Sequence, residues 1–155
     1  MGKLRLGVLA SGGGTNLQAI IDNCEAGRID AEVRVVISNN SKSGALERAR
    51  KHGIAAVHLS SVKFDSFEAL DEAILSTLKR YNVDLVLLAG YMKKVGPKVL
   101  EGYKNRVLNI HPALLPKFGA VVCMDMRCTR RSLPAVRGSP DRPCMWSMRS
   151  TIMGR

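Results

Sequence analysis

The chain lacks several features that would assign it to a membrane or metal-binding class. It has no run of 18 apolar residues, so no transmembrane helix is predicted, and its N-terminus lacks the apolar core of a signal peptide. Cys123, Cys128 and Cys144 do not have metal-ligand spacing. We therefore expect a cytoplasmic protein with free thiols, no metal and no membrane contact.

The composition changes sharply near residue 120. Residues 1–119 hold 17 Lys and Arg against 11 Asp and Glu, whereas residues 120–155 hold seven Arg, no Lys and two Asp. Five of the seven Met and three of the four Cys also fall in that last segment. It shows no helical or strand period, so it has little apolar surface to bury. We expect an α/β domain over 1–119 and an irregular, disordered basic tail over 120–155.

Apolar runs and helical stripes alternate along residues 4–119. The predicted strands cover 4–10, 32–38, 55–59, 84–89 and 106–108, and the predicted helices begin near 15, 45, 64 and 97. This alternation is typical of an open, mostly parallel, doubly wound sheet of Rossmann-like type. The run 84–89 predicts a strand buried on both faces. One helical stripe predicts core residues: Phe67, Leu70, Ile74, Leu78 and Tyr81.

A glycine-rich loop, Ser11-Gly12-Gly13-Gly14-Thr15-Asn16, follows the first predicted strand and precedes a helix. This order is typical of a phosphate site, because glycines let backbone N–H groups approach an anion at a helix start. Thr15 or Asn16 could cap the helix or bind the phosphate. The loop lacks a full dinucleotide fingerprint and a Walker lysine, so we expect a monophosphate. The alternative is a tight strand-to-helix turn.

Two more polar loops follow predicted strands. Gly90-Tyr91-Met92-Lys93-Lys94-Val95 comes after 84–89, and Asn109-Ile110-His111-Pro112 comes after 106–108. Asn109 and His111 are two residues apart, so on an extended backbone they point the same way. Their alternative interpretation is a turn asparagine and a hydrogen-bonded structural histidine. Because strand ends share one edge of a parallel sheet, we expect the three loops to meet there.

The stretch Asn109-Ile110-His111-Pro112-Ala113-Leu114-Leu115-Pro116 resembles the signature of folate-dependent formyltransferases. The resemblance covers residues 4–119 and is strongest with the branch acting on phosphoribosylglycinamide in purine synthesis. It implies that 10-formyltetrahydrofolate is the cosubstrate, that no metal takes part, and that Asn109 and His111 are catalytic. It further implies that the substrate phosphate binds at Gly14, Thr15 and Asn16. The implied folate-binding residues are Met92, Lys93, Lys94, Val95 and Asn109.

The resemblance ends at Gly119, after which the family has a stretch with a catalytic Asp. Reading residues 145–155 from the third base of each codon permits Val-Val-Asp-Glu-Glu-Tyr-Asp-His-Gly-Pro, which matches that stretch. The same shift permits Tyr-Gly-His-Ala over residues 123–127. We interpret the tail as a shifted reading frame that begins near Gly119 and Ala120, and we expect the chain as written to be an impaired enzyme.

Three other interpretations remain. Methionyl-tRNA formyltransferases share the Asn-x-His signature but lack the Gly-Gly-Gly-Thr-Asn loop. The tail, with a net charge of +5, could bind nucleic acid, although Trp146 is its one aromatic residue, which argues against this. The chain could also be an inactive ligand-binding fragment. The sequence does not decide between a monomer and a homodimer.

Overall fold

The structure, a computed structural model, describes residues 2–110. Within this range the polypeptide forms a five-stranded sheet with the strand order β3-β2-β1-β4-β5. The predicted tail, His111 and the rest of the loop that ends at Pro116 lie outside the described residues. The strands are β1 (Leu4–Leu9), β2 (Ala31–Ser38), β3 (Ala55–His58), β4 (Leu85–Ala89) and β5 (Val107–Ile110).

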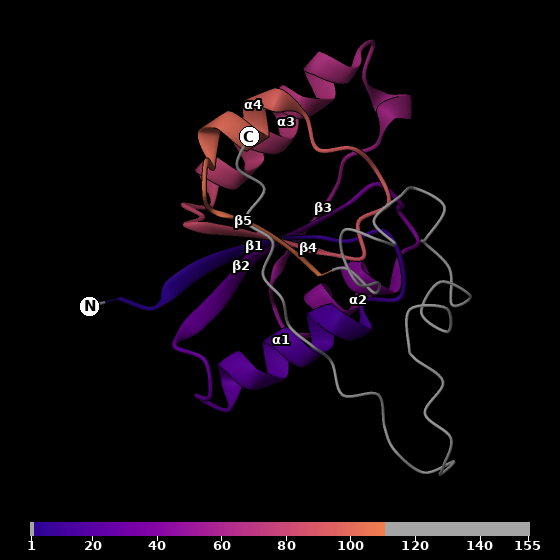
Figure 1. Cartoon of the computed structure of the whole chain (residues 1–155). Helices are drawn as coiled ribbons and strands as arrows, with labels where there is room; N and C mark the ends of the chain where they lie inside the picture. Colours follow the sequence, from indigo (N-terminus) through magenta and orange to yellow (C-terminus); the bar gives the residue numbers. More distant parts are fainter. Residues whose placement is uncertain (1, 111–155) are drawn as a thin grey trace, which may run out of the picture. The chain divides into compact units, whose positions relative to one another are not determined.

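Helices cover both faces of the sheet, as the doubly wound prediction requires. Figure 1 shows α1 and α2 on one side of the strands and α3 and α4 on the other. The bounds are α1 (Thr15–Glu25), α2 (Gly44–Lys51), α3 (Phe67–Arg80) and α4 (Pro97–Gly102), with a short 3₁₀ turn, η1, at Ser61–Lys63. The predicted α/β class is therefore confirmed.

Strand β1 lies at the centre of the strand order and pairs in parallel with both β2 and β4. The chain leaves β1 toward β2 and then β3 on one side, whereas β4 and β5 lie on the other side. The connections after β1 and β4 therefore diverge. Such a switch point opens a crevice beyond the carboxyl ends of the two strands, where ligands bind in α/β proteins.

Local signals in the sequence explain where the helices begin and end. The Ser43 hydroxyl caps α2 by accepting a hydrogen bond from the Leu46 N–H at 3.3 Å, and the Ser66 hydroxyl caps α3 in the same way. Gly53 follows α2 with φ of 66°, the left-handed conformation that ends helices. Pro97 occupies the first turn of α4, where its missing N–H costs nothing.

The main core lies between the sheet and the α3–α4 layer. Leu70, Ile74 and Leu78 of the predicted stripe are buried, and Tyr81 packs against the same cluster. Phe67 is 43% exposed, so its assignment to the core was wrong. It occupies the first position of α3, before the stripe meets the sheet at Leu70, and it remains partly in solvent.

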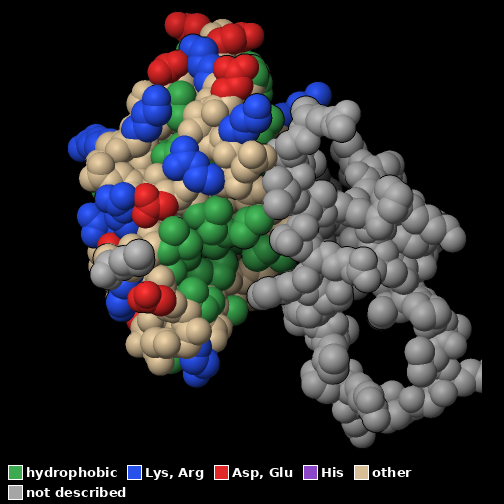
Figure 2. Space-filling view, turned by 60° about the vertical axis from the view of Figure 1, so that its left-hand side comes forward, with side chains coloured by type: hydrophobic (Ala, Val, Ile, Leu, Met, Phe, Trp, Pro, Cys, Tyr) green, Lys and Arg blue, Asp and Glu red, His purple; other side chains and the backbone are tan. Residues whose placement is uncertain are grey.

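The predicted burial of β4 on both faces is confirmed only in part, since each face packs against a core cluster but to a different depth. Val86 is fully buried in the α3–α4 core, but Leu85 and Leu87, on the other face, are only half-buried. Among the described elements, α1 makes its main contacts with β2 and α2 rather than with β4. On the face shown in Figure 2, hydrophobic side chains gather in one patch between charged groups.

The last strand is longer than predicted. The sequence predicts a strand that stops before Asn109, whereas β5 runs on through Asn109 and Ile110. Apolar side chains mark only part of a strand, so its polar end was missed. None of the helices in the described range is long and apolar enough to cross a membrane.

Candidate functional site

The loops after β1 and β4 meet at the switch point of the sheet, as expected from the sequence. The Ser11 N–H donates to the Gly90 carbonyl at 3.1 Å, and the Ser11 hydroxyl accepts from the Met92 N–H at 2.8 Å. Two polar loops that lie far apart in the sequence are thus joined directly. A ligand that binds beyond these strands would contact both loops.

The carbonyl groups of the glycine loop are held against α2. The Gly12 carbonyl accepts from the Ala45 N–H at 3.1 Å, and the Gly13 carbonyl accepts from Arg48 Nε at 2.9 Å. In a planar trans peptide the next N–H points away from the carbonyl. The N–H groups of Gly13 and Gly14 are therefore directed away from α2, so the loop presents these donors on its outer side.

The start of α1 adds further donors to this loop. Gly14 is the N-cap, with φ of 76°, and no side chain of the described residues caps the helix. Thr15 and Asn16 are the first two residues inside α1, so of the two roles that the sequence left open for them, the capping role is not seen in the structure. The first helical hydrogen bond runs from the Gln18 N–H to the Gly14 carbonyl at 2.9 Å. The earlier N–H groups of the first turn are thus available to an anion.

Gly14 also fits closely against α2. A Cβ atom at this position would lie 2.7 Å from the Ala45 Cα, closer than real Cβ contacts. The loop therefore requires glycine here both for its positive φ and for its approach to α2. Arg48, half-buried on α2, additionally donates from Nη1 to the Gln18 Oε1 at 3.1 Å, so its positive charge is fixed next to the loop.

The second loop, residues 90–96, presents a mixture of exposed and packed residues. Met92 is 55% exposed and both Lys93 and Lys94 are exposed, whereas Val95 packs against the main core. The backbone N–H of Met92 is already bonded to Ser11. Tyr91 packs against the core as well, and burial raises the pKa of its hydroxyl, so the phenol is neutral.

A buried carboxyl group fixes the far end of this loop. Asp71 of α3 is 1% exposed and accepts hydrogen bonds from the Lys98 N–H at 2.8 Å and the Val99 N–H at 3.3 Å. These are first-turn donors of α4, so Asp71 caps that helix from another element. A Cβ at Gly96 would overlap the Asp71 carboxyl, which explains glycine at the loop end.

The third predicted loop is described only at its start. Asn109 lies on β5 and is half-buried, and β5 is the neighbour of β4 in the sheet. His111, the second predicted catalytic residue, lies outside the described residues. The structure therefore brings together the first and second loops and places Asn109 on the strand next to the second.

Sequence reasoning missed three residues that hold this site together: Ser11, Asn39 and Arg48. The Ser11 hydroxyl donates to the Asn39 Oδ1 as well as accepting from Met92. Ser11 directly precedes the glycines, so its place at a strand end was a usable signal. Asn39 and Arg48 act through the register of β2 and the packing of α2, and neither can be read from local sequence.

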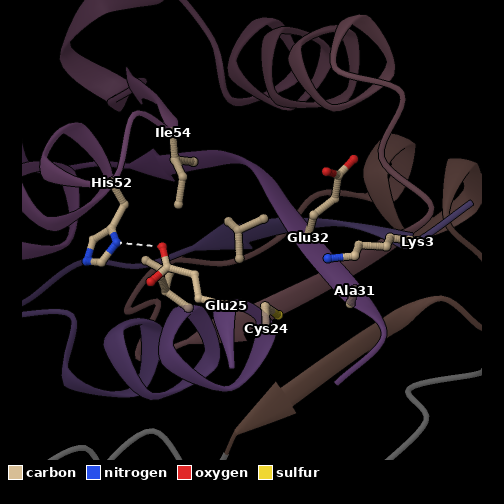
Figure 3. A pocket seen from close by; sticks show the side chains of 9 residues that line it. Lys3, Cys24, Glu25, Ala31, Glu32, His52 and Ile54 are labelled. Atoms are coloured by element: carbon tan, nitrogen blue, oxygen red, sulfur yellow. Dashed lines mark hydrogen bonds and ion pairs between the residues drawn. The ribbon is translucent and has the colours of Figure 1, made fainter. Parts of the chain in front are cut away.

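A separate cavity of about 160 Å³ lies away from the switch point, between α1 and the start of β2 (Figure 3). The His52 Nδ1 and the Glu25 Oε1 are 2.8 Å apart at its edge, and Cys24 lies in its wall. Burial raises the pKa of the Cys24 thiol, which disfavours the reactive thiolate.

Within residues 2–110, no group of three His, Cys, Asp or Glu side chains is placed to hold a metal ion.

Comparison with known proteins gives one family for this chain. The family model described as formyl transferase matches residues 4–127, which is most of the chain. The phosphoribosylglycinamide formyltransferase of Escherichia coli is 48% identical over 111 residues, covering 72% of this chain and 52% of the relative. That of Haemophilus influenzae is 42% identical, covering 76% of this chain and 55% of the relative.

Solved structures agree with the sequence comparison. Glycinamide ribonucleotide transformylase 1 from Symbiobacterium toebii is 51% identical, with a TM-score of 0.73, covering 75% of this chain and 55% of that one. Phosphoribosylglycinamide formyltransferase from Brucella melitensis is 35% identical, with a TM-score of 0.76, covering 83% and 65%. The chain thus spans about half the length of the curated relatives that it matches.

Proposed function

The chain belongs to the formyl transferase family, and from this premise we propose that it derives from an enzyme that formylates phosphoribosylglycinamide. The formyl donor would be 10-formyltetrahydrofolate. In this proposal the glycine loop binds the substrate phosphate and the loop 90–95 lines the folate site. Both the E. coli and the H. influenzae relative carry the name of this activity.

The observation that carries the proposal is the arrangement of the glycine loop. Its carbonyl groups are bound by Ala45 and Arg48, so its donors face the opposite side. Backbone donors at a helix start match the requirements of a phosphate group. Gly14, Thr15 and Asn16 would hold it, with Arg48 supplying nearby positive charge.

The proposed chemistry is a direct transfer. The amine nitrogen of the substrate attacks the formyl carbon, and a tetrahedral oxyanion forms that needs donors aimed at it. Asn109 and protonated His111 would supply these donors. The bond from carbon to the folate nitrogen then breaks as His111 gives that nitrogen a proton, and the attacking amine passes its own proton to water. General acid catalysis of this kind contributes about 10²- to 10⁴-fold to a rate.

We further propose that the reading frame shifts near Gly119 and Ala120. The resemblance found in the sequence stops at Gly119, although the match of the family model runs on to residue 127, and the shifted frame permits a stretch with the family's Asp. That Asp would raise the pKa of His111 by its charge, keeping the imidazole protonated. The coding DNA around codon 119 tests this proposal. If closely related genes read the DNA after codon 119 in the same frame as this chain, the proposal is wrong.

The phosphate site can be tested on the chain as it exists. Titration with phosphoribosylglycinamide should shift the NMR signals of the Gly14, Thr15 and Asn16 amides. The same glycinamide riboside without its phosphate is the matched control and should shift them far less. If the folded chain shows no shift at saturating phosphoribosylglycinamide, the proposed site is wrong.

A second candidate function, nucleic-acid binding, is favoured by the seven arginines of residues 120–155. It predicts DNA binding that weakens steeply with salt and disappears when that segment is removed. Binding of phosphoribosylglycinamide without DNA binding would decide for the enzyme.

A further inference from the structure

We propose that Ser11 is a positioning residue that couples the phosphate loop to the loop 90–95. This inference rests on the proposed function, because the two loops are the proposed substrate and folate sites. Through Ser11, binding of phosphoribosylglycinamide at one loop orders the backbone of the other. Ser11 itself contacts neither substrate in this proposal.

The hydrogen bonds of Ser11 join three strand ends. Its N–H donates to the Gly90 carbonyl after β4, its hydroxyl accepts from the Met92 N–H, and the same hydroxyl donates to the Asn39 Oδ1 after β2. Ser11 itself follows β1 and is 8% exposed. One buried side chain thus uses both its donor and its acceptor capacity between elements that are separate in sequence.

Among the described residues, the Met92 N–H has its hydrogen bond to this hydroxyl. Met92 is 55% exposed, so burial does not hold it. Residues 90–96 contain no helix or strand, and their far end is fixed separately by Asp71. Tyr91 and Val95 pack against the core on either side, and the Ser11 hydroxyl is the polar contact that joins the Met92 backbone to the start of the glycine loop.

Asn39 fixes the direction of the Ser11 hydroxyl. Because the proton of Ser11 points to Asn39 Oδ1, a lone pair of the same oxygen faces the Met92 N–H. The Asn39 carbonyl lies 3.3 Å from the His58 Nε2 of β3, which holds the asparagine in turn. A ligand that orders residues 11–16 therefore also restricts the conformations of the backbone at 90–95. Coupling of this kind is reciprocal, so a ligand at 90–95 also orders residues 11–16.

The first test measures amide hydrogen exchange in the ligand-free chain. Ser11→Ala removes the acceptor, so exchange of the Met92 amide should accelerate roughly twofold to tenfold, the range that one net hydrogen bond allows. Asn39→Ala should give a smaller acceleration at the same amide. Ser66→Ala is the matched control, because it removes a serine hydroxyl bonded to a backbone N–H on α3. It should leave Met92 unchanged.

The second test adds phosphoribosylglycinamide. Exchange at Met92 should slow when the ligand binds the wild-type chain or Ser66→Ala, and this slowing should be lost in Ser11→Ala. Affinity for 10-formyltetrahydrofolate should fall about tenfold or less in Ser11→Ala, within the limit set by one hydrogen bond. If Ser11 had a merely structural role, Ser11→Ala would not abolish the slowing of Met92 exchange that the ligand causes.

The outcomes separate this inference from the proposed function. Unchanged ligand-free exchange in Ser11→Ala overturns the inference, and so does ligand-induced slowing that survives that substitution. If phosphoribosylglycinamide fails to bind the folded wild-type chain, the proposed function fails, while the ligand-free rates still decide whether Ser11 holds Met92. If Ser11→Ala does not fold, Asn39→Ala carries the same test, and unchanged Met92 exchange there overturns the inference.

Discussion

Substituting Gly14 by alanine tests whether the glycine loop is shaped by its contact with α2. Two costs are expected for Gly14→Ala. The positive φ of 76° disfavours any side chain, and the new Cβ would lie 2.7 Å from the Ala45 Cα and 3.0 Å from its N. The second cost cannot be relieved by rotating a side chain, because the facing atoms belong to the backbone of α2.

Gly27 provides the matched control at the other end of α1. It has φ of 71°, close to that of Gly14, but no atom of the described residues lies within 4 Å of the place that a Cβ would occupy. Gly27→Ala therefore carries the conformational cost alone, about 1–2 kcal/mol. Gly14→Ala adds the cost of overpacking, roughly 1–3 kcal/mol, so the sum is about 2–5 kcal/mol.

The assay is urea unfolding of the wild-type chain and both variants, followed by far-UV circular dichroism. Phosphoribosylglycinamide titrations accompany it, and Gly14→Ala should lose affinity while Gly27→Ala retains it. Equal free energies of unfolding for the two variants would refute the close packing of the loop on α2. Full affinity in a folded Gly14→Ala chain would refute the role of the loop in binding.

Three further predictions concern stability and use urea unfolding as the measurement. The Arg5 guanidinium donates a hydrogen bond to the Asp84 carboxylate and is the main reason why the pKa of Asp84 falls from 3.8 to about 2. The stability that this pair adds is therefore present above about pH 4 and is lost as the pH falls toward 2. Asp84→Asn should flatten the plot of unfolding free energy against pH in that range. Asp71→Ala should cost about 1–3 kcal/mol, because it leaves buried α4 donors unpaired, and a loss no larger than that of an exposed alanine substitution would contradict the capping role. Val86→Ala, at a fully buried position of β4, should cost roughly 2 kcal/mol, more than Leu87→Ala at a half-buried position, and the reverse order would contradict the deeper packing of the Val86 face.

Local sequence signals were sufficient for most of the fold. Ser66 marks the start of α3 and Gly53 the end of α2, because capping requires particular residues at particular positions. Pro97 marks the start of α4 for a similar reason. The order strand, glycine loop, helix predicted the first loop of the site, since each part is a local feature. The meeting of the first two loops followed from the rule on parallel strand ends.

Features that depend on distant neighbours were not predictable. An apolar run such as Leu85–Ala89 looks the same whether one or both faces are covered, so the half-burial of Leu87 could not be foreseen. The cap of α4 by Asp71 crosses from another helix and has no sequence pattern. The same applies to Arg48, whose guanidinium reaches the Gly13 carbonyl only because α2 packs on the loop.

The most direct test of the account is an assay of formyl transfer with the reading frame restored. One base is inserted near the codons of Gly119 and Ala120, and both the original and the restored chain are purified and incubated with phosphoribosylglycinamide and 10-formyltetrahydrofolate. The account predicts formylated product from the restored chain and a rate lower by orders of magnitude from the original, because the Asp that supports His111 and the positioning by the later segment are lost. Equal rates would contradict the shifted frame, and a folded restored chain without activity would contradict the proposed enzyme.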